Sequence, residues 1–254
     1  MTFKSKKPTS KEILHFYQKL APVSALDSPN YQRLIIEEWL KQLSSNLNLK
    51  KMYVLDFGCG KGNNLKVLCR NFNQITACDI SSRALQLARE ATQHKNINFI
   101  RIKEQILPFK EGQFDFIMAT EVLEHVPNLK KTFLELDRII KKNGYILIST
   151  PNYWNLRGLS KKFLEFFLGE GRWDPGRSHV GGYERFMTPT LLLKLLAKNY
   201  NILETRGSDY GTAWSPPMVK MYPKRFDNFF EITLGKVGLF KKFGMNYYLL
   251  AQKI

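Results

Sequence analysis

Residues 53–62, YVLDFGCGKG, constrain what this chain can fold into more than any other stretch. The apolar run 53–55 is typical of a buried strand, and it leads into a turn that carries three glycines, Gly58, Gly60 and Gly62. A second apolar run, 75–78, is followed by the acid Asp79. Glycines let a backbone approach a ligand where a side chain would collide, and Asp79 can accept hydrogen bonds from both hydroxyls of a ribose. This layout predicts a nucleotide-binding βαβ unit.

The spacing of the glycines narrows the class of ligand. Dinucleotide-binding folds usually carry G-x-G-x-x-G, with a pyrophosphate at the N-terminus of the following helix. This chain has G-x-G-x-G, with Asp56 two positions ahead, and it has no G-x-x-x-x-G-K-[ST] run. The sequence therefore argues against a P-loop. Many ordinary tight turns also hold two or three glycines, so the glycines alone are weak evidence. The prediction of a nucleotide-binding unit depends on the order of strand, Asp56, glycines and Asp79 along the chain.

Apolar runs alternate with amphipathic segments along the chain. Strands are expected at 53–55, 75–78, 98–102, 114–119, 145–149, 200–204 and 246–252. Helices are expected at 11–20, 31–43, 63–70, 81–93, 129–140 and 189–199. Strands that are apolar along their length are typical of a parallel sheet covered on both faces. The pattern therefore predicts the α/β class: a Rossmann-like, doubly wound, mostly parallel seven-stranded sheet with helices on both faces.

Local signals refine three of the expected helices. Thr188 as N-cap and Pro189 in the first turn open the helix 189–199. Asn143-Gly144 is a typical C-cap pair, and it is expected to end the helix that begins near residue 129. The helix 31–43 is expected to bury an apolar face made of Leu34, Ile35, Trp39 and Leu43.

Two long segments, 152–187 and 207–245, interrupt the alternation of strands and helices. Both are rich in aromatic, glycine and basic residues. Long insertions in a compact α/β domain are usually functional, and ligands of such sheets bind beyond the carboxyl ends of the strands. We expect one domain, 1–254, with helices in the N-terminal 1–50 and with the two insertions forming a cap over the substrate.

Composition limits the compartment and the partners. The formal net charge of +17 predicts attraction to an anionic partner, which could be RNA, an acidic lipid surface or an acidic substrate, although a solvated lysine-rich surface is an equal alternative. The three cysteines show no C-x-x-C spacing, so neither a disulfide framework nor a metal site is expected, and a reducing compartment fits. No signal peptide and no long apolar run is evident. The expected location is cytoplasmic, with peripheral membrane contact as an open alternative.

Several motifs beyond the glycine turn carry a family resemblance. These are LPFKEGQFDF at 107–116, EVLEHVP at 121–127, GYILISTPN at 144–152, and His179 followed by FMTP at 186–189. Together with YVLDFGCGKG they resemble the class I S-adenosylmethionine (SAM)-dependent methyltransferases. The histidine-containing segment is similar to that of the ubiquinone-biosynthesis type and of related glycan O-methyltransferases.

The resemblance implies SAM as cofactor and S-adenosylhomocysteine (SAH) as product. Many family members carry an acidic residue directly after the third strand. The corresponding position in this chain is Lys103, and the resemblance assigns the role of that acid to the next residue, Glu104. The cofactor-binding residues that the resemblance implies are Asp56, Gly58, Gly60, Gly62, Asp79, Ile80, Glu104, Gln105 and Glu121.

Methyl transfer from a sulfonium is an in-line displacement that depends mainly on positioning. A hydroxyl nucleophile also gains from a base that removes its proton, and histidine suits that role near neutral pH. His125 follows the fourth expected strand, and His179 lies in the first insertion. We expect one of these two histidines to act as base or to orient the acceptor.

The acceptor is less well defined by the sequence. The segments 156–173 and 220–243 combine aromatic or aliphatic residues with lysine and arginine, which suits a cap helix or a helix lying on an acidic membrane. They favour a lipophilic or lipid-linked acceptor, and together with the resemblance the expected acceptor is small, lipid-linked or a glycan. An RNA methyltransferase, favoured by the charge, and a non-catalytic SAM-binding scaffold remain alternatives. The sequence leaves the oligomeric state open.

Overall fold

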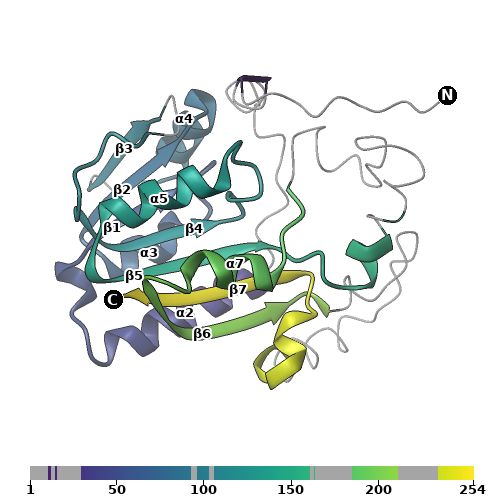
Figure 1. Ribbon diagram of the computed structural model, residues 1–254. Coiled ribbons are helices and arrows are strands. Elements are labelled where there is room, and N and C mark those ends of the chain that lie inside the picture. The colour runs from purple at the N-terminus through teal and green to yellow at the C-terminus, as the bar shows by residue number, and fades with distance from the viewer. Residues whose placement is uncertain are drawn as a thin grey trace.

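A computed structural model of the chain describes residues 11, 12, 15, 30–92, 96–102, 106–160, 163, 185–210 and 234–254. Its centre is a seven-stranded sheet with the strand order β3-β2-β1-β4-β5-β7-β6 (Figure 1). Strands β1 to β5 pair in parallel, and β7 runs antiparallel to both β5 and β6. The strand order turns back between β1 and β4, which is where ligands of doubly wound sheets bind. The predicted α/β class and mostly parallel sheet are confirmed.

The elements have the following bounds. The strands are β1 (Tyr53–Phe57), β2 (Gln74–Asp79), β3 (Ile97–Arg101), β4 (Phe114–Thr120), β5 (Ile140–Pro151), β6 (Tyr200–Ser208) and β7 (Asn246–Lys253). The α-helices are α2 (Asn30–Ser44), α3 (Leu65–Asn71), α4 (Ser82–Ala91), α5 (Leu129–Ile139) and α7 (Pro189–Leu196). Three short 3-10 helices are η1 (Leu49–Lys51), η2 (Leu234–Lys236) and η3 (Gly238–Lys242).

The helices cover the two faces of the sheet separately. Helices α5 and α7 pack on one face, and α2, α3 and α4 pack on the other. Side chains along β4 alternate between the two cores, since Ile117 packs under α5 while Phe116 and Met118 face the opposite cluster. This alternation follows from the two-residue repeat of a strand. Both faces are therefore buried, and the carboxyl edge of the parallel strands is left for a ligand.

Two local expectations prove wrong. Helix α5 ends at Ile139, not at Asn143-Gly144, because Ile140 already pairs with Phe114 in the sheet. Asn143, with φ of 61°, instead lies in the early part of β5, where the pairing with β4 shifts register. In α2, Leu34 is exposed, and Ile36 and Leu40 join Ile35 and Trp39 in the core.

Other expectations are confirmed locally. Thr188 caps α7, because its side-chain oxygen accepts the backbone N–H of Leu191 at 3.2 Å. Ser81 caps α4 in the same way through the N–H of Ala84. Of the expected helix 11–20, Lys11, Glu12 and His15 are described, and all three are helical. Most of the two insertions, and with them the expected cap, lies outside the described residues.

No helix in the described part of the chain combines the length and the hydropathy needed to cross a bilayer.

Candidate active site

The glycine turn lies directly after β1, and its three glycines serve different purposes. Gly58, Gly60 and Gly62 have φ of 73°, 52° and 85°. A Cβ on Gly58 would lie 2.3 Å from Cγ2 of Val122, and a Cβ on Gly62 would lie 2.9 Å from Cδ1 of Leu65. A Cβ on Gly60 would meet no atom within 4 Å. Packing of the protein against itself requires Gly58 and Gly62, whereas Gly60 borders open space in which a ligand can approach the backbone.

Asp79, the last residue of β2, joins the glycine turn to the next helix. The backbone N–H of Gly60 donates to Oδ2 of Asp79 at 2.9 Å, and the N–H of Ser81 donates to Oδ1 at 2.8 Å. Burial raises the pKa of Asp79, and backbone hydrogen bonds from Ser81, Gly60 and Ile80 counteract part of that rise. Each oxygen of a carboxylate has a second lone pair. Asp79 can therefore hold the turn and still accept hydroxyl groups from a ligand.

Asp56, the fourth residue of β1, is buried. Its Oδ2 has no hydrogen-bond partner among the described residues. Burial, with a smaller contribution from the charge of Asp79, raises the pKa of Asp56 to about 7. Buried polar atoms are normally hydrogen-bonded, so an unsatisfied carboxyl oxygen beneath the glycine turn marks a place where a donor or a cation from a ligand would be stabilised.

Glu121 begins the loop after β4 in a left-handed conformation, with φ of 51°. Its backbone N–H donates to the carbonyl of Ser149 at 3.0 Å, and its Oε1 accepts the hydroxyl of Ser149 at 2.7 Å. Such a conformation costs a non-glycine residue roughly 1–3 kcal/mol and tends to occur at functional sites. These two bonds to β5 hold Glu121 at the carboxyl edge of the sheet.

His125 lies four residues further along the same loop and is partly exposed. Its Nε2 is 3.7 Å from Oε1 of Glu124, which is buried. The backbone N–H of Arg185 donates to the carbonyl of Glu124 at 2.7 Å, and Nη2 of Arg185 donates to the carbonyl of Pro127 at 3.2 Å. The chain that leads into α7 is thus fastened to the loop that carries His125.

Three expected site residues, Glu104, Gln105 and His179, lie outside the described residues. The structure brings the other expected residues to the same edge, since Asp56, the glycines, Asp79, Ile80, Glu121 and His125 all lie at or just beyond the carboxyl ends of β1, β2 and β4. In the described ranges, no group of three or more His, Cys, Asp or Glu side chains could hold a metal ion. The three cysteines are free.

Asn152 is a residue at this edge that the sequence reading does not single out. It is fully buried, and its Nδ2 donates to the carbonyls of Lys242 and Gly244 at 2.7 and 2.9 Å. The Nδ2 of Asn155 donates to the same carbonyl of Gly244 at 3.1 Å. The chain leaving β5 is thereby joined to the chain entering β7. The one signal in the sequence is a buried-type polar residue directly after an apolar strand.

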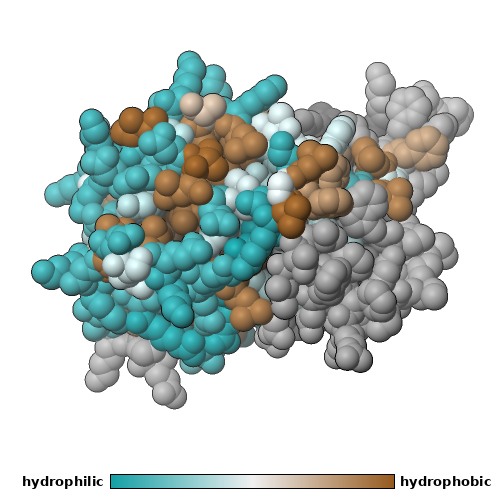
Figure 2. All heavy atoms as spheres, turned by 90° about the horizontal axis from the view of Figure 1, so that it is seen from below, coloured by the Kyte–Doolittle hydropathy of each residue, from teal (hydrophilic) through white to brown (hydrophobic). Residues whose placement is uncertain are grey.

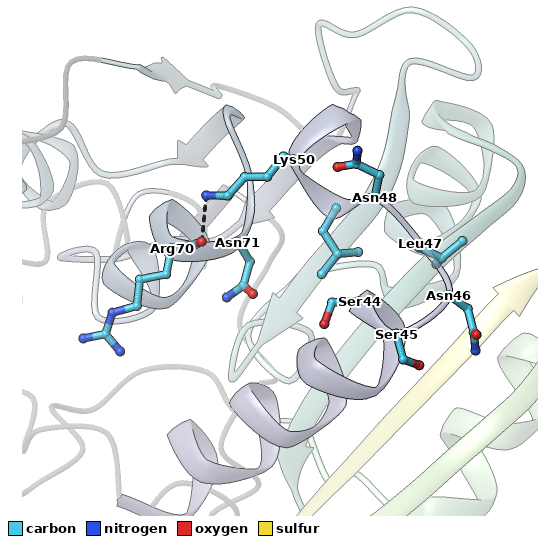
Figure 3. Close-up of a pocket in the computed structure, with 9 residues that line it drawn as sticks. Ser44, Ser45, Asn46, Leu47, Asn48, Lys50, Arg70 and Asn71 are labelled. Atoms are coloured by element: carbon cyan, nitrogen blue, oxygen red, sulfur yellow. Dashed lines mark hydrogen bonds between the residues drawn. The ribbon is translucent and has the colours of Figure 1, made fainter.

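The pocket in Figure 3 lies elsewhere in the molecule. It is a hollow of about 450 Å³ lined by residues from the end of α2, from η1 and from the end of α3. Lys50 reaches across it and donates to the carbonyl of Arg70 at 2.7 Å. None of the expected site residues lines this pocket. A lysine that caps the carboxyl end of α3 is a structural contact, so we do not place the reaction there.

Comparisons with known proteins bear on the family and the fold of the chain. Residues 55–148 match a family model described as a methyltransferase domain. The ubiquinone biosynthesis O-methyltransferase of Rickettsia prowazekii is 29% identical over 182 residues, which cover 70% of this chain and 70% of that protein.

Solved structures support the fold. A SAM-dependent methyltransferase from Aquifex aeolicus superimposes with a TM-score of 0.55 at 17% identity, covering 98% of this chain and 100% of that one. An S-adenosylmethionine-dependent methyltransferase from Mesorhizobium loti gives a TM-score of 0.58 at 15% identity, covering 85% and 97% of the two chains.

Proposed function

The chain is a class I SAM-dependent methyltransferase, and we propose that it methylates an oxygen atom of a small, lipid-linked or glycan acceptor. The O-methyltransferase relative at 29% identity supports oxygen as the methylated atom. We further propose that residues 1–254 act as one catalytic domain, with the segments 152–187 and 207–245 contacting the acceptor.

The observation that carries the proposal is the set of groups gathered around the glycine turn. SAM supplies a methyl group on a positively charged sulfur when it is bound. The open space beside Gly60, the two carboxylate oxygens of Asp79 and the unsatisfied Oδ2 of Asp56 fit such a ligand. Asp79 would accept ribose hydroxyls, and Asp56 would stabilise the positive end of the ligand. Ile80, Glu104, Gln105 and Glu121, together with Gly58 and Gly62, would complete the cofactor site.

His125 is our candidate for the base that accepts the proton of the acceptor hydroxyl. Its ring lies at the edge where β4 ends, and the buried Glu124 beside it favours the protonated ring that results. His179 is the second candidate for the base or for an acceptor contact. An acceptor held against His125 would be positioned by both insertions, because Arg185 and Asn152 fasten them at this edge.

An RNA acceptor is the rival that one observation favours, the formal net charge of +17. Binding to phosphates would fall steeply with salt. A scaffold that binds SAM without transferring its methyl group is a further alternative.

The deciding experiment is label transfer. The full chain is incubated with methyl-labelled SAM and an extract of the source cells, and the extract is then separated into lipid, glycan, RNA and protein fractions. Label in the lipid or glycan fraction supports the proposal, and sensitivity of the labelled bond to ether or ester cleavage identifies oxygen. Label in RNA supports the first rival, and SAH binding by calorimetry without any transfer supports the scaffold.

A further inference from the structure

Two short segments far apart in the sequence expose large apolar side chains next to lysines and arginine. The first, 152–163, begins where β5 ends and includes the helical residues 156–160. The second, 234–245, contains η2 and η3 and ends where β7 begins. Trp154 is 52% exposed, Phe163 63%, Leu239 68% and Phe240 50%. Leu156, Leu159 and Val237 are exposed as well.

The two segments start from one rigid junction. The amides of Asn152 and Asn155 both donate to the carbonyl of Gly244, and the backbone N–H of Asn152 donates to the carbonyl of Met245. The hydroxyl of Tyr210 donates to the carbonyl of Phe240 at 3.0 Å and ties η3 to the end of β6. Figure 2 shows hydrophobic side chains in two groups on the visible face, one left of centre and one right of centre beside the grey atoms, and the second group is on the side where Figure 1 draws the short helix after β5. The exposed residues therefore belong to a surface that the fold itself holds in place.

The charge of the two segments has a single sign. Residues 152–163 and 234–245 contain no Asp or Glu, and their cations are Arg157, Lys161, Lys162, Lys236, Lys241 and Lys242. Lys161 and Lys162 lie outside the described residues, and Lys236 pairs with Glu38 at 3.1 Å, so Arg157, Lys241 and Lys242 are the cations that support the proposal. Apolar side chains that can enter the boundary of the acyl chains and cations that attract anionic headgroups are the two components of peripheral membrane binding. We propose that these two segments form a docking surface for an acidic lipid bilayer.

The side chains favour a bilayer over the other anionic partners. Single-stranded RNA is held by base stacking on aromatic rings, but Leu156, Leu159, Val237 and Leu239 are aliphatic and offer no stacking. A second copy of this chain would bring two positively charged faces together, which is electrostatically unfavourable. A bilayer uses both the aliphatic and the aromatic residues. The inference deepens the proposed function, because a lipid-linked acceptor would then be met at the membrane beside the site.

Vesicle flotation tests the surface without any cofactor or acceptor, so its outcome is independent of methyl transfer. The full chain is mixed at low salt with vesicles of phosphatidylglycerol or of phosphatidylcholine. The test variant is Leu239→Glu/Phe240→Glu, and the matched control is Leu34→Glu/Leu134→Glu, which changes two side chains of similar exposure, 59% and 57%, on α2 and α5. Thermal melting checks that each variant folds.

We expect the wild type and the control to float with vesicles of phosphatidylglycerol and not with vesicles of phosphatidylcholine. The test variant should float at least tenfold less with phosphatidylglycerol, and added salt should weaken the flotation of the wild type. No flotation of the wild type, or an equal loss in both variants, overturns the proposal. The proposal is also overturned if the wild type is a dimer and the test variant a monomer, or if the wild type and the test variant both bind RNA and neither floats. If the test variant does not fold, Trp154→Phe replaces it: vesicles should shift the wild-type tryptophan emission to the blue, and an unchanged shift in Trp154→Phe contradicts the proposal.

Discussion

The backbone N–H of Gly60 donates to the Oδ2 of Asp79 at 2.9 Å, and this bond joins the turn after β1 to the end of β2. The two residues are 19 positions apart in the sequence. The same carboxylate also accepts the N–H of Ser81, which caps α4. One side chain thus fixes the backbone on both sides of the proposed cofactor site, so its replacement should affect both folding and ligand binding.

Asp79→Asn tests this double role. An amide has one acceptor oxygen, so one of the two backbone N–H groups loses its partner and faces an NH2 group instead. We expect a loss of about 1–3 kcal/mol in the free energy of unfolding and a loss of SAH binding by calorimetry at temperatures where the variant is folded. Glu90→Gln, on the exposed side of α4, is the control. Full SAH affinity in Asp79→Asn would refute the assignment of Asp79 to the cofactor.

Gly58→Ala should mainly reduce the stability of the fold, and Gly60→Ala should mainly reduce SAH binding. A methyl group at position 58 would lie 2.3 Å from Cγ2 of Val122, whereas at position 60 it would meet open space. Both changes carry the cost of a left-handed alanine, roughly 1–2 kcal/mol. We expect Gly60→Ala to lower the melting temperature by only a few degrees and to weaken SAH binding, and Gly58→Ala to lower the melting temperature much more. Tight SAH binding by Gly60→Ala would place the ligand elsewhere.

Asp56 should make stability depend on pH. Its pKa is raised to about 7 in the folded chain from an ordinary value of 3.8, so the folded state holds a proton that the unfolded state has lost. The contribution of the protonated Asp56 carboxyl to the free energy of unfolding is therefore fully present below pH 4 and is lost as pH rises through about 7. Asp56→Asn should flatten the fall in the free energy of unfolding between pH 5 and 8, measured with urea. Parallel curves for the two proteins would contradict the raised pKa.

The fold was predictable where a signal is local. The apolar strands, the glycine turn and the cap Thr188 depend on neighbours in the sequence, and all appear where expected. The end of α5 was not predictable in this way. Asn143-Gly144 has the composition of a helix cap, but pairing of Ile140 with Phe114 draws the chain into the sheet before the cap is reached. Sheet pairing is a tertiary contact that overrides local propensity.

The site was predictable in its composition but not in its connections. The motif residues at the edges of β1, β2 and β4 could be read from spacing. The junction of Asn152 with Gly244 spans 92 positions, and the ion pair of Glu38 with Arg206 spans 168. Neither contact has a pattern in the sequence, because the first depends on the pairing of β5 with β7 and the second on where α2 lies against β6.

Glu38→Gln should destabilise the protein far more than Glu37→Gln. Arg206 is buried on β6 and donates to both oxygens of Glu38, at 2.7 and 3.0 Å, while Glu37 pairs with exposed arginines. Removing the charge of Glu38 takes away the short ion pair of a buried guanidinium and leaves the longer one to Glu204 at 3.8 Å. We expect a cost of about 1–3 kcal/mol, whereas exposed pairs are worth about 0–1 kcal/mol. Urea unfolding at pH 7 compares the two variants. Equal losses in the free energy of unfolding would show that the pair of Glu38 with Arg206 stabilises the protein no more than an exposed ion pair does.

The same pair has a defined pH window. The hydrogen bond from Arg206, helped by Lys236, lowers the pKa of Glu38 to about 2 from 4.5. The stability it contributes is thus present above pH 4.5 and is lost as pH falls through about 2. The gap between Glu38→Gln and the wild type should narrow below pH 4. A gap that stays constant down to pH 2 would argue against the lowered pKa.

His125→Gln should separate catalysis from cofactor binding. If His125 accepts the proton of the acceptor, its loss should lower kcat by roughly 10²–10⁴-fold, leave SAH affinity unchanged, and remove the fall in rate at acidic pH that protonation of the ring produces. Turnover is measured with the acceptor fraction identified by label transfer. His15→Gln, at an exposed helical position, is the control and should match the wild type. An unchanged kcat in His125→Gln at every pH would leave His179 as the remaining candidate, and a parallel loss of SAH affinity would assign His125 to the cofactor instead.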